Sequence, residues 1–142
     1  MTESLNEIFA KCEMPLRPLN PETGISENDL NDMHVTLACD KEQNRLSVSG
    51  IIMEIEDLYQ PAFKDLQKTI LSLNDADFLP DSFRIGINLP ELTVEILSFL
   101  DLKCSHDDLG GALELLMRRL TFYGIESRKR IFAAYAELSS GA

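Results

Sequence analysis

The sequence predicts an α+β fold with an antiparallel sheet, and three observations support this prediction. Segments in which apolar and polar residues alternate come in consecutive pairs joined by short turns, which is typical of antiparallel strands. Segments with apolar residues at helical spacing stand before, between and after these pairs. The length of 142 residues is a common size for one domain. We therefore expect one domain over residues 1–142, in the order helix, two or more strands, helix, two strands, helix.

The first expected element is a short helix near the N-terminus. Ser4 and Glu7 have the spacing of a capping box. The apolar residues that follow at helical intervals are Leu5, Ile8, Phe9 and Cys12. Three prolines and a glycine then stand among polar residues, which predicts an irregular surface loop over residues 15–32.

Two strands joined by a polar turn are expected next. Residues 33–40 alternate between apolar and polar side chains, as a half-buried strand requires. In residues 45–55 the apolar positions change parity after Gly50, from Leu46 and Val48 to Ile51, Met53 and Ile55. A β-bulge at Gly50 would produce such a change.

A central helix and a hairpin follow. Helical spacing of apolar residues predicts the helix from Pro61 to Asn74, because proline suits a first helical turn. Alternating residues between Phe83 and Leu102, with a turn at Pro90, predict two antiparallel strands.

The last expected element is a helix that Ser105 caps. Its inner face is expected to consist of Leu109, Leu113, Leu116, Met117 and Leu120. Gly124 is expected to interrupt it, which leaves an additional helical tail over residues 125–142.

The charge of the chain argues against nucleic acid and membrane surfaces as partners. Asp and Glu number 24 against 13 Lys and Arg, so the formal net charge is −11. Such a field repels phosphate backbones and anionic lipids, and no apolar run approaches the roughly 20 residues of a membrane span. The first seven residues lack a basic segment and an apolar core, so we expect no secretory signal and a cytoplasmic location.

The residues that most often carry catalysis or metals are few and scattered. The two histidines are His34 and His106, and the cysteines Cys12, Cys39 and Cys104 form no Cys-x-x-Cys pair. We therefore predict no catalytic site, no metal and no cofactor. An enzyme built from dispersed Cys and His residues stays open as an alternative.

Apolar residues exceed what one thin layered domain can cover in two places. The first is the end of the fourth expected strand, where both faces carry apolar residues: Leu97, Phe99, Leu100 and Leu102. The second is the first helix. An excess apolar patch indicates a protein partner, and a sheet with helices on one side can accept a second copy or an extended peptide.

The order of the elements resembles the class I type III secretion chaperones. The stretch Thr69–Asn74 resembles the Leu-x-Leu-Asn ending of their central helix, and the hairpin and a long C-terminal helix follow it. The resemblance covers roughly residues 33–123. In that family a strand usually follows the first helix, whereas the prolines of residues 15–32 depart from this pattern.

The resemblance implies a small cytoplasmic bacterial homodimer that binds the N-terminal chaperone-binding segment of a secreted effector. Such a protein keeps the effector soluble and competent for secretion, as part of virulence, without nucleotide or metal. The implied dimer residues are Phe63, Leu66, Ile70, Leu97, Phe99 and Leu100. The implied client-binding residues are Leu5, Ile8, Phe9, Val48 and Met53. Two further alternatives are a regulator that sequesters another protein of the secretion system and an acidic mimic of nucleic acid.

Overall fold

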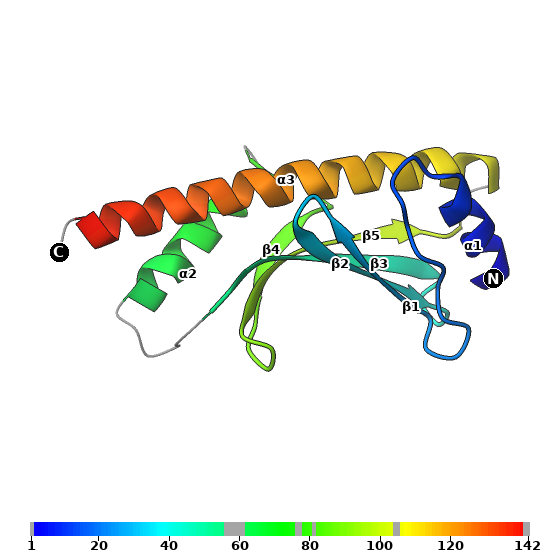
Figure 1. Cartoon of the computed structure of the whole chain (residues 1–142), viewed down its shortest axis with the longest axis horizontal. Helices are drawn as coiled ribbons and strands as arrows, with labels where there is room; N and C mark the ends of the chain where they lie inside the picture. The colour runs from blue at the N-terminus through cyan, green and yellow to red at the C-terminus, as the bar shows by residue number, and fades with distance from the viewer. Residues whose placement is uncertain (1, 56–61, 76–77, 81, 104–105, 141–142) are drawn as a thin grey trace.

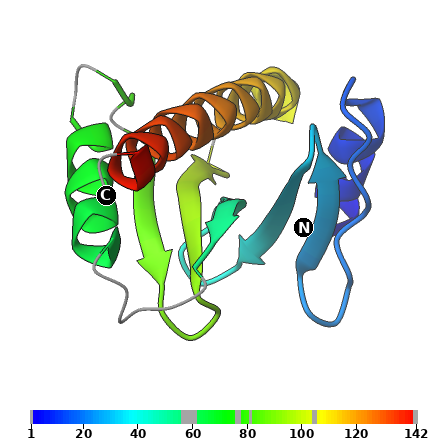
Figure 2. The ribbon, with the colours of Figure 1, turned by 60° about the vertical axis from the view of Figure 1, so that its left-hand side comes forward.

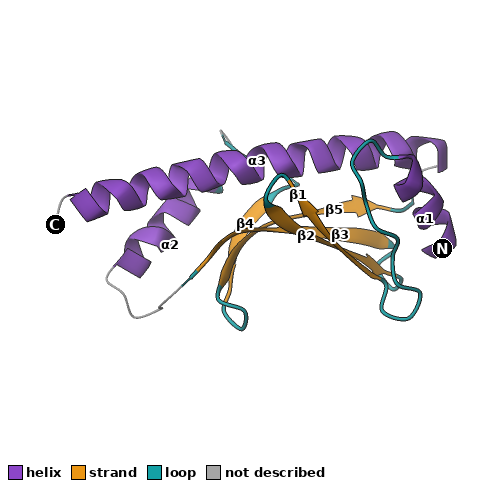
Figure 3. Cartoon of the chain, viewed as in Figure 1, coloured by secondary structure: helices purple, strands orange, loops and turns teal. Residues whose placement is uncertain are grey.

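The computed structural model describes residues 2–55, 62–75, 78–80, 82–103 and 106–140 (Figure 1). It contains both element types in the expected order, so the predicted α+β class is confirmed (Figure 3). The elements are α1 (Thr2–Lys11), β1 (Ile25–Leu30), β2 (Met33–Asp40), β3 (Arg45–Glu54), α2 (Ala62–Leu73), β4 (Arg84–Asn88), β5 (Thr93–Asp101) and α3 (His106–Ser140).

The five strands form one sheet in the order β1-β2-β3-β5-β4, and every neighbouring pair is antiparallel. The strands β1 and β4 are therefore its two edges. Helix α3 crosses one face of the sheet, with α1 and α2 near its opposite ends (Figures 1 and 2). The other face lies away from α3.

The hydrophobic core lies between the sheet and the helices. On the sheet side it includes Leu37, Leu46 and Ile96, and on the helix side Leu113 and Leu120, all of them at most 1% exposed. Strand alternation and the helical stripe each place their apolar residues on one side, so the two sets meet as a single layer interface. This burial follows the periodicity of the sequence.

Residues 15–32 are not a continuous irregular loop, because they contain β1. The sequence hides this strand, since two of its three core-facing residues are the buried polar residues Ser26 and Asn28. Their side chains bind the preceding loop: the Ser26 hydroxyl donates to the Arg17 carbonyl at 2.6 Å, and the Arg17 amide donates to Asn28 Oδ1 at 2.7 Å. The strand that was expected to be missing after the first helix is thus present.

A two-residue turn joins β1 to β2. Asn31 and Asp32 both have positive φ angles, 50° and 62°. Two successive residues with positive φ characterise the type I′ turn that best matches the twist of a hairpin, and Asn and Asp tolerate it. This Asn-Asp pair is the sequence signal that could have revealed β1.

The predicted change of parity at Gly50 is wrong. Burial continues to alternate through Gly50 to Ile52, which is 2% exposed, and the register shifts only between Ile51 and Met53. The irregularity therefore exists but lies beyond Gly50. It turns Ile55 inward and leaves Ile51 half-buried on the opposite face.

Two glycines permit a close approach of α3 to the sheet. A Cβ atom at Gly124 would lie 2.7 Å from the Met33 sulfur, and one at Gly50 would lie 2.9 Å from it. Met33 is 1% exposed and fills the space between them. The predicted interruption at Gly124 is consequently wrong, because α3 continues without a break to Ser140 and glycine serves packing there.

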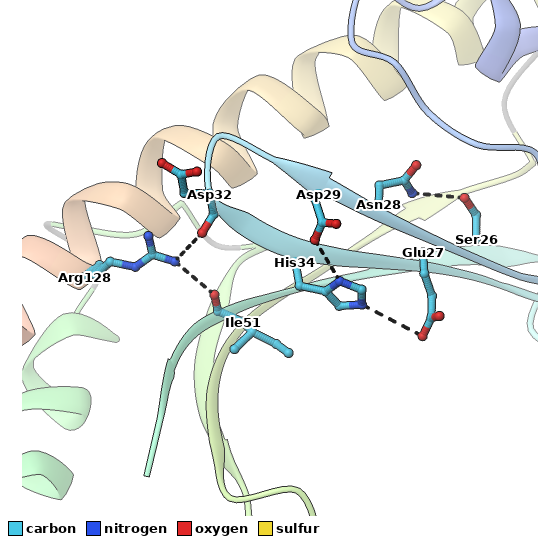
Figure 4. A network of polar contacts seen from close by, with 8 residues as sticks. All are labelled: Ser26, Glu27, Asn28, Asp29, Asp32, His34, Ile51 and Arg128. Carbon is cyan, nitrogen blue, oxygen red and sulfur yellow. Dashed lines mark hydrogen bonds and ion pairs between the residues drawn. The ribbon is translucent and has the colours of Figure 1, made fainter. Parts of the chain in front are cut away.

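Arg128 joins the second half of α3 to the sheet through side-chain hydrogen bonds (Figure 4). Its Nε donates to the Ile52 carbonyl at 2.8 Å, and its Nη2 lies 3.2 Å from the Asp32 carbonyl and 3.3 Å from the Ile51 carbonyl. These carbonyls belong to the irregular part of β3 and to the β1–β2 turn. One guanidinium group therefore gives three backbone carbonyls a charged donor.

Candidate partner-binding surface

The face of the sheet away from α3 carries an unusual mixture of small, large apolar and basic side chains. We call this surface the open face. Because strand residues alternate, it consists of the residues between the core positions of each strand. Leu97 and Phe99 of β5 stand on it with exposures of 42% and 46%. We call these two residues the ridge.

Beside the ridge the open face is hollowed. Small side chains of β2 and β3 form its floor, which we call the trough: Thr36, Ala38, Ser47 and Ser49. The hollow has a volume of about 530 Å³ and also includes the ridge and two arginines. The ridge stands higher than the trough because its side chains are larger. The hollow therefore follows from the difference in residue size.

The two arginines of the hollow are Arg45 and Arg84. The Arg45 guanidinium lies over the Phe99 ring, 5.1 Å from its centroid, in cation–π geometry. Its Nε is buried and has no hydrogen-bond partner among the residues that the structure describes. Among the described residues no carboxylate lies within ion-pair distance of either arginine. Two unpaired cations in a chain of net charge −11 indicate that this hollow can attract an acidic group.

The residues predicted to bind the client lie mostly in the core. Leu5, Ile8, Phe9 and Val48 are between 1% and 8% exposed. Helix α1 contacts α3, and the apolar side of α1 belongs to the main hydrophobic cluster. The apolar excess inferred for the first helix is therefore wrong. Met53 is half-buried and is the one member of this set with accessible area.

The residues predicted to form the dimer interface fall into three groups. Leu66 and Ile70 are buried on the side of α2 that packs against the core, so they are not available to a second copy. Phe63 and Leu100 are half-buried, and the ridge is exposed. Sequence reasoning missed Leu71, which is 73% exposed, because its helical spacing suggested that it shares the buried stripe.

The two edges of the sheet differ in how they are protected. At β4, the side chain of Asn74 makes two hydrogen bonds of 2.8 Å with the backbone of Ile85, one to its carbonyl and one from its amide. The same side chain also donates to the Ile70 carbonyl at the end of α2. The asparagine of the Leu-x-Leu-Asn motif thus lies at the end of α2. Its side-chain amide pairs with the outer backbone groups of β4 in the way that a further strand would.

The β1 edge carries no such cover at its middle. The Gly24 carbonyl accepts a hydrogen bond from the Cys39 amide of β2. The Ile25 carbonyl instead accepts one from the Asn20 amide, on the side of β1 away from β2. In a strand, the backbone amide and carbonyl of successive residues point alternately toward and away from the neighbouring strand. The backbone groups of Glu27 and Asp29 therefore point away from β2, in the same direction as those of Ile25. Within the described part of the chain, no hydrogen bond occupies these outward groups.

Two acidic side chains of β1, Glu27 and Asp29, lie at this open edge and contact the His34 imidazole (Figure 4). His34 Nδ1 lies 3.2 Å from Asp29 Oδ1, and its Nε2 lies 3.9 Å from Glu27 Oε1. Both carboxylates are largely exposed, at 83% and 66%. This arrangement orients the imidazole on the surface and leaves both acids accessible to another molecule.

The other residues considered for chemistry do not gather around a substrate cavity, so far as the structure describes them. Cys12 and Cys39 are half-buried, and burial raises the pKa of both thiols. Cys104 and the side chain of His106 lie outside the described residues. In the described ranges no three His, Cys, Asp or Glu side chains could hold a metal ion together. The absence of catalysis and of a cofactor stays a prediction.

A second cleft, of about 610 Å³, separates α1 from the beginning of α3. It includes Ile8, Cys12 and Glu114, and this carboxylate adds to burial in raising the pKa of the Cys12 thiol. The cleft is larger than the hollow of the open face, but its apolar wall is the nearly buried Ile8. The open face offers a partner more apolar area and unpaired charge.

Comparison with known proteins gives a match at the level of fold. No family model matches the sequence, and no curated protein sequence matches it. A structure described as the HopA1–SchA chaperone–effector complex contains a chain with 18% identity and a TM-score of 0.59, covering 89% of this chain and 91% of that one. A chain of the ExsC–ExsE complex has 15% identity and a TM-score of 0.64, covering 90% of both chains.

These matches show that the chain has the fold found in a chaperone–effector complex. They agree with the α+β architecture that the resemblance to class I type III secretion chaperones implies. A shared fold does not by itself transfer a function, so the function rests on the surfaces described above. No helix among the described residues is long and apolar enough to cross a membrane.

Proposed function

We propose that this protein is a type III secretion chaperone that binds the N-terminal segment of a secreted effector in the bacterial cytoplasm. It acts by holding this segment extended, so that the effector stays soluble and competent for secretion. The observation that carries the proposal is a sheet with one open face and one open edge, on a fold shared with a chaperone–effector complex.

The proposed mechanism is passive binding of an extended chain. The outward backbone groups of Glu27 and Asp29 can pair with a client strand, and the half-buried side chain of Met53 supplies apolar contact elsewhere on the surface. A disordered client pays for its ordering when it binds, so a long contact surface is expected. Neither nucleotide nor metal takes part in this mechanism.

We further propose that the protein is a homodimer and that the ridge forms part of the contact. Leu97 and Phe99 are large apolar side chains exposed next to each other on one strand, and burial between two copies would remove them from water. Phe63 of α2 and Leu100, which lies on the covered face opposite Leu46, are half-buried and remain separate candidates for contact with a second copy. Nucleic acid and membranes are not among the proposed partners, because the chain is strongly acidic.

The client proposal is tested with labelled N-terminal segments of the effectors secreted by the same bacterium. We expect one or a few segments to bind, and bound effector to remain in solution where free effector aggregates. The variant Asp29→Pro removes one outward amide at an edge position where proline is tolerated, and it should weaken binding about tenfold or more. The control Asp29→Thr keeps the amide and should bind normally. A chain that binds none of the segments would contradict the proposal.

A further inference from the structure

Arg45 has two acidic neighbours across the strands, yet both of them are engaged elsewhere. The register places Asp40 of β2 and Asp101 of β5 opposite Arg45. Asp40 Oδ1 accepts hydrogen bonds from two amides of the turn that follows it, at 3.0 and 3.2 Å, and Asp101 Oδ1 accepts one from the Lys103 amide at 3.0 Å. Within the described part of the chain, neither carboxylate lies within ion-pair distance of Arg45. The two turns therefore hold the acids that would otherwise neutralise this arginine.

The Arg45 side chain instead lies beside the ridge and lines the hollow. Its guanidinium carbon is 5.1 Å from the centroid of the Phe99 ring, and its buried Nε has no hydrogen-bond partner among the described residues. A guanidinium group has five N–H donors, and a buried donor without an acceptor costs free energy. Arg45 therefore has donors available for an acceptor that enters the hollow.

The charges around the hollow favour a negative group at the Arg45 end. Among the described residues that line it, the charged ones are Arg45 and Arg84. Glu95 of β5 is not part of the lining, and its Oε2 accepts a hydrogen bond from a hydroxyl group of its own strand at 2.9 Å. Glu27 of β1 aligns, through β2, with Ser49, which is four residues or about 13 Å from Arg45 along β3. The other acid of β1 lies farther still.

The trough beside Arg45 has room for an extended chain. The register aligns Ala38 of β2 with Ser47 of β3, and Ser47 with Phe99 of the ridge, so two small side chains lie next to a large one. The hollow of about 530 Å³ is large enough for several side chains of a partner. A second copy that contacts the ridge from the side of β4, where α2 lies, leaves the trough accessible.

We propose that the trough binds an extended client segment through one acidic side chain, whose carboxylate pairs with the Arg45 guanidinium, and one large apolar side chain, which packs against the ridge. This inference rests on the proposed client function and names the chemistry that the client must present. An arginine and a carboxylate form two parallel, charge-assisted hydrogen bonds, so the pair also fixes the position of the segment.

The net charge of the chain limits which segments can bind in this way. At −11 the chain repels a segment that is acidic throughout. The expected client is therefore neutral or basic over most of its bound length and has an isolated Asp or Glu at the Arg45 position. A disordered segment can meet this requirement, because it adapts its backbone to the surface on which it lies.

The experiment measures the affinity of a fluorescently labelled effector segment for the full chain by anisotropy. The probe is a segment that binds in the test of the client function. Arg45→Gln removes the charged donors and should raise the dissociation constant at least about tenfold. Arg119→Gln changes the net charge equally at an exposed position of α3, on the other side of the sheet, and should change the dissociation constant less than about twofold.

Replacements in the segment identify the acid that Arg45 binds. Each Asp of the segment is changed in turn to Asn, and each Glu to Gln. One of these changes should weaken binding to the original chain by about the same factor as Arg45→Gln. When that segment is combined with the R45Q variant, the further loss should be less than about twofold, since the two changes remove the same contact.

The other outcomes separate this inference from the client function. If the segment binds R45Q normally, or if no single acid replacement weakens binding, the inference is wrong and the client function stands. Losses that simply multiply in the combination would also contradict it. A variant R45Q that weakens self-association in sedimentation equilibrium, with unchanged client binding, would assign the hollow to a second copy. A chain that binds none of the segments would overturn both proposals. Thermal unfolding verifies that each variant is folded.

Discussion

The two faces of the sheet are built from alternate residues of the same strands, yet they have opposite compositions. On β5, Ile96 is fully buried beneath α3, whereas the next residue, Leu97, is 42% exposed on the open face. The covered face is apolar on the central strands, and the open face combines a trough, a ridge and two arginines that have no carboxylate partner among the described residues. The comparison teaches that a large apolar side chain does not by itself mark a core position, since Leu97 is as apolar as its buried neighbour Ile96. What distinguishes them is which face the helices cover.

The largest expected effect separates the two faces directly. Ile96→Ala leaves a cavity in the core and should lower the free energy of unfolding by about 2 to 5 kcal/mol. Leu97→Ala should change the unfolding of the monomer by less than about 1 kcal/mol, since its side chain keeps much of its contact with water. Urea unfolding at a concentration where the chain is monomeric measures both. An equal decrease in the free energy of unfolding for both variants would show that the Leu97 side chain is packed, and not exposed, in the monomer.

The second prediction concerns the attachment of α3 to the covered face. Arg128→Met keeps the aliphatic stem but leaves three carbonyls without this donor, so the free energy of unfolding should fall by about 1.5 to 3 kcal/mol. The neighbour Lys129 makes an exposed ion pair with Glu126 at 3.3 Å. Lys129→Met should therefore cost at most about 0.5 kcal/mol by the same urea measurement. A similar loss in both variants would contradict a special role for Arg128.

A third prediction compares the sheet edges. Asn74→Ala removes two hydrogen bonds to Ile85 and should lower the free energy of unfolding by about 1 to 2 kcal/mol. The amide of Ile85 should then exchange with deuterium about tenfold faster, because its partner is gone. Ser72→Ala, also near the end of α2, removes one exposed hydrogen bond to the Thr69 carbonyl and should leave this exchange unchanged. Unaltered exchange in N74A would mean that Asn74 does not protect the edge.

The smallest expected effect tests the close approach of α3 to the sheet. Gly124→Ala forces Met33 to move, and overpacking should lower the free energy of unfolding by about 1 kcal/mol despite the better helix propensity of alanine. Gly111→Ala lies in the same helix, and its Cβ would meet no atom within 4 Å. It should raise the free energy of unfolding by up to about 1 kcal/mol. Opposite signs in thermal or urea unfolding confirm the prediction, and equal signs contradict it.

Much of the fold follows from local pattern, and the departures from the prediction have identifiable causes. Strand β1 escaped detection because Ser26 and Asn28 face inward to bind the loop before it. The sequence predicts a β-bulge at Gly50 and a helix interruption at Gly124. In the structure both positions are next to Met33, where a Cβ atom would come too close to its sulfur, and no local pattern can show this contact.

The candidate site was predictable only in part. The apolar character of Leu97 and Phe99 on the face away from Ile96 followed from alternation, and both are exposed as a binding surface requires. The surplus inferred for α1 was wrong, because α3 is close enough to bury Leu5 and Phe9. The hollow with its two arginines depends on the register of four strands, which the sequence does not display.

The sequence by itself determined the α+β class, the order of most elements and the two sides of each strand, because these depend on residue spacing within a segment. The tertiary structure alone decided which side became the core, since that depends on where α3 packs after more than 100 residues of chain. It also aligned Glu27 with Arg84 across five strands. Contacts between distant segments make a surface, and spacing within one segment cannot specify them.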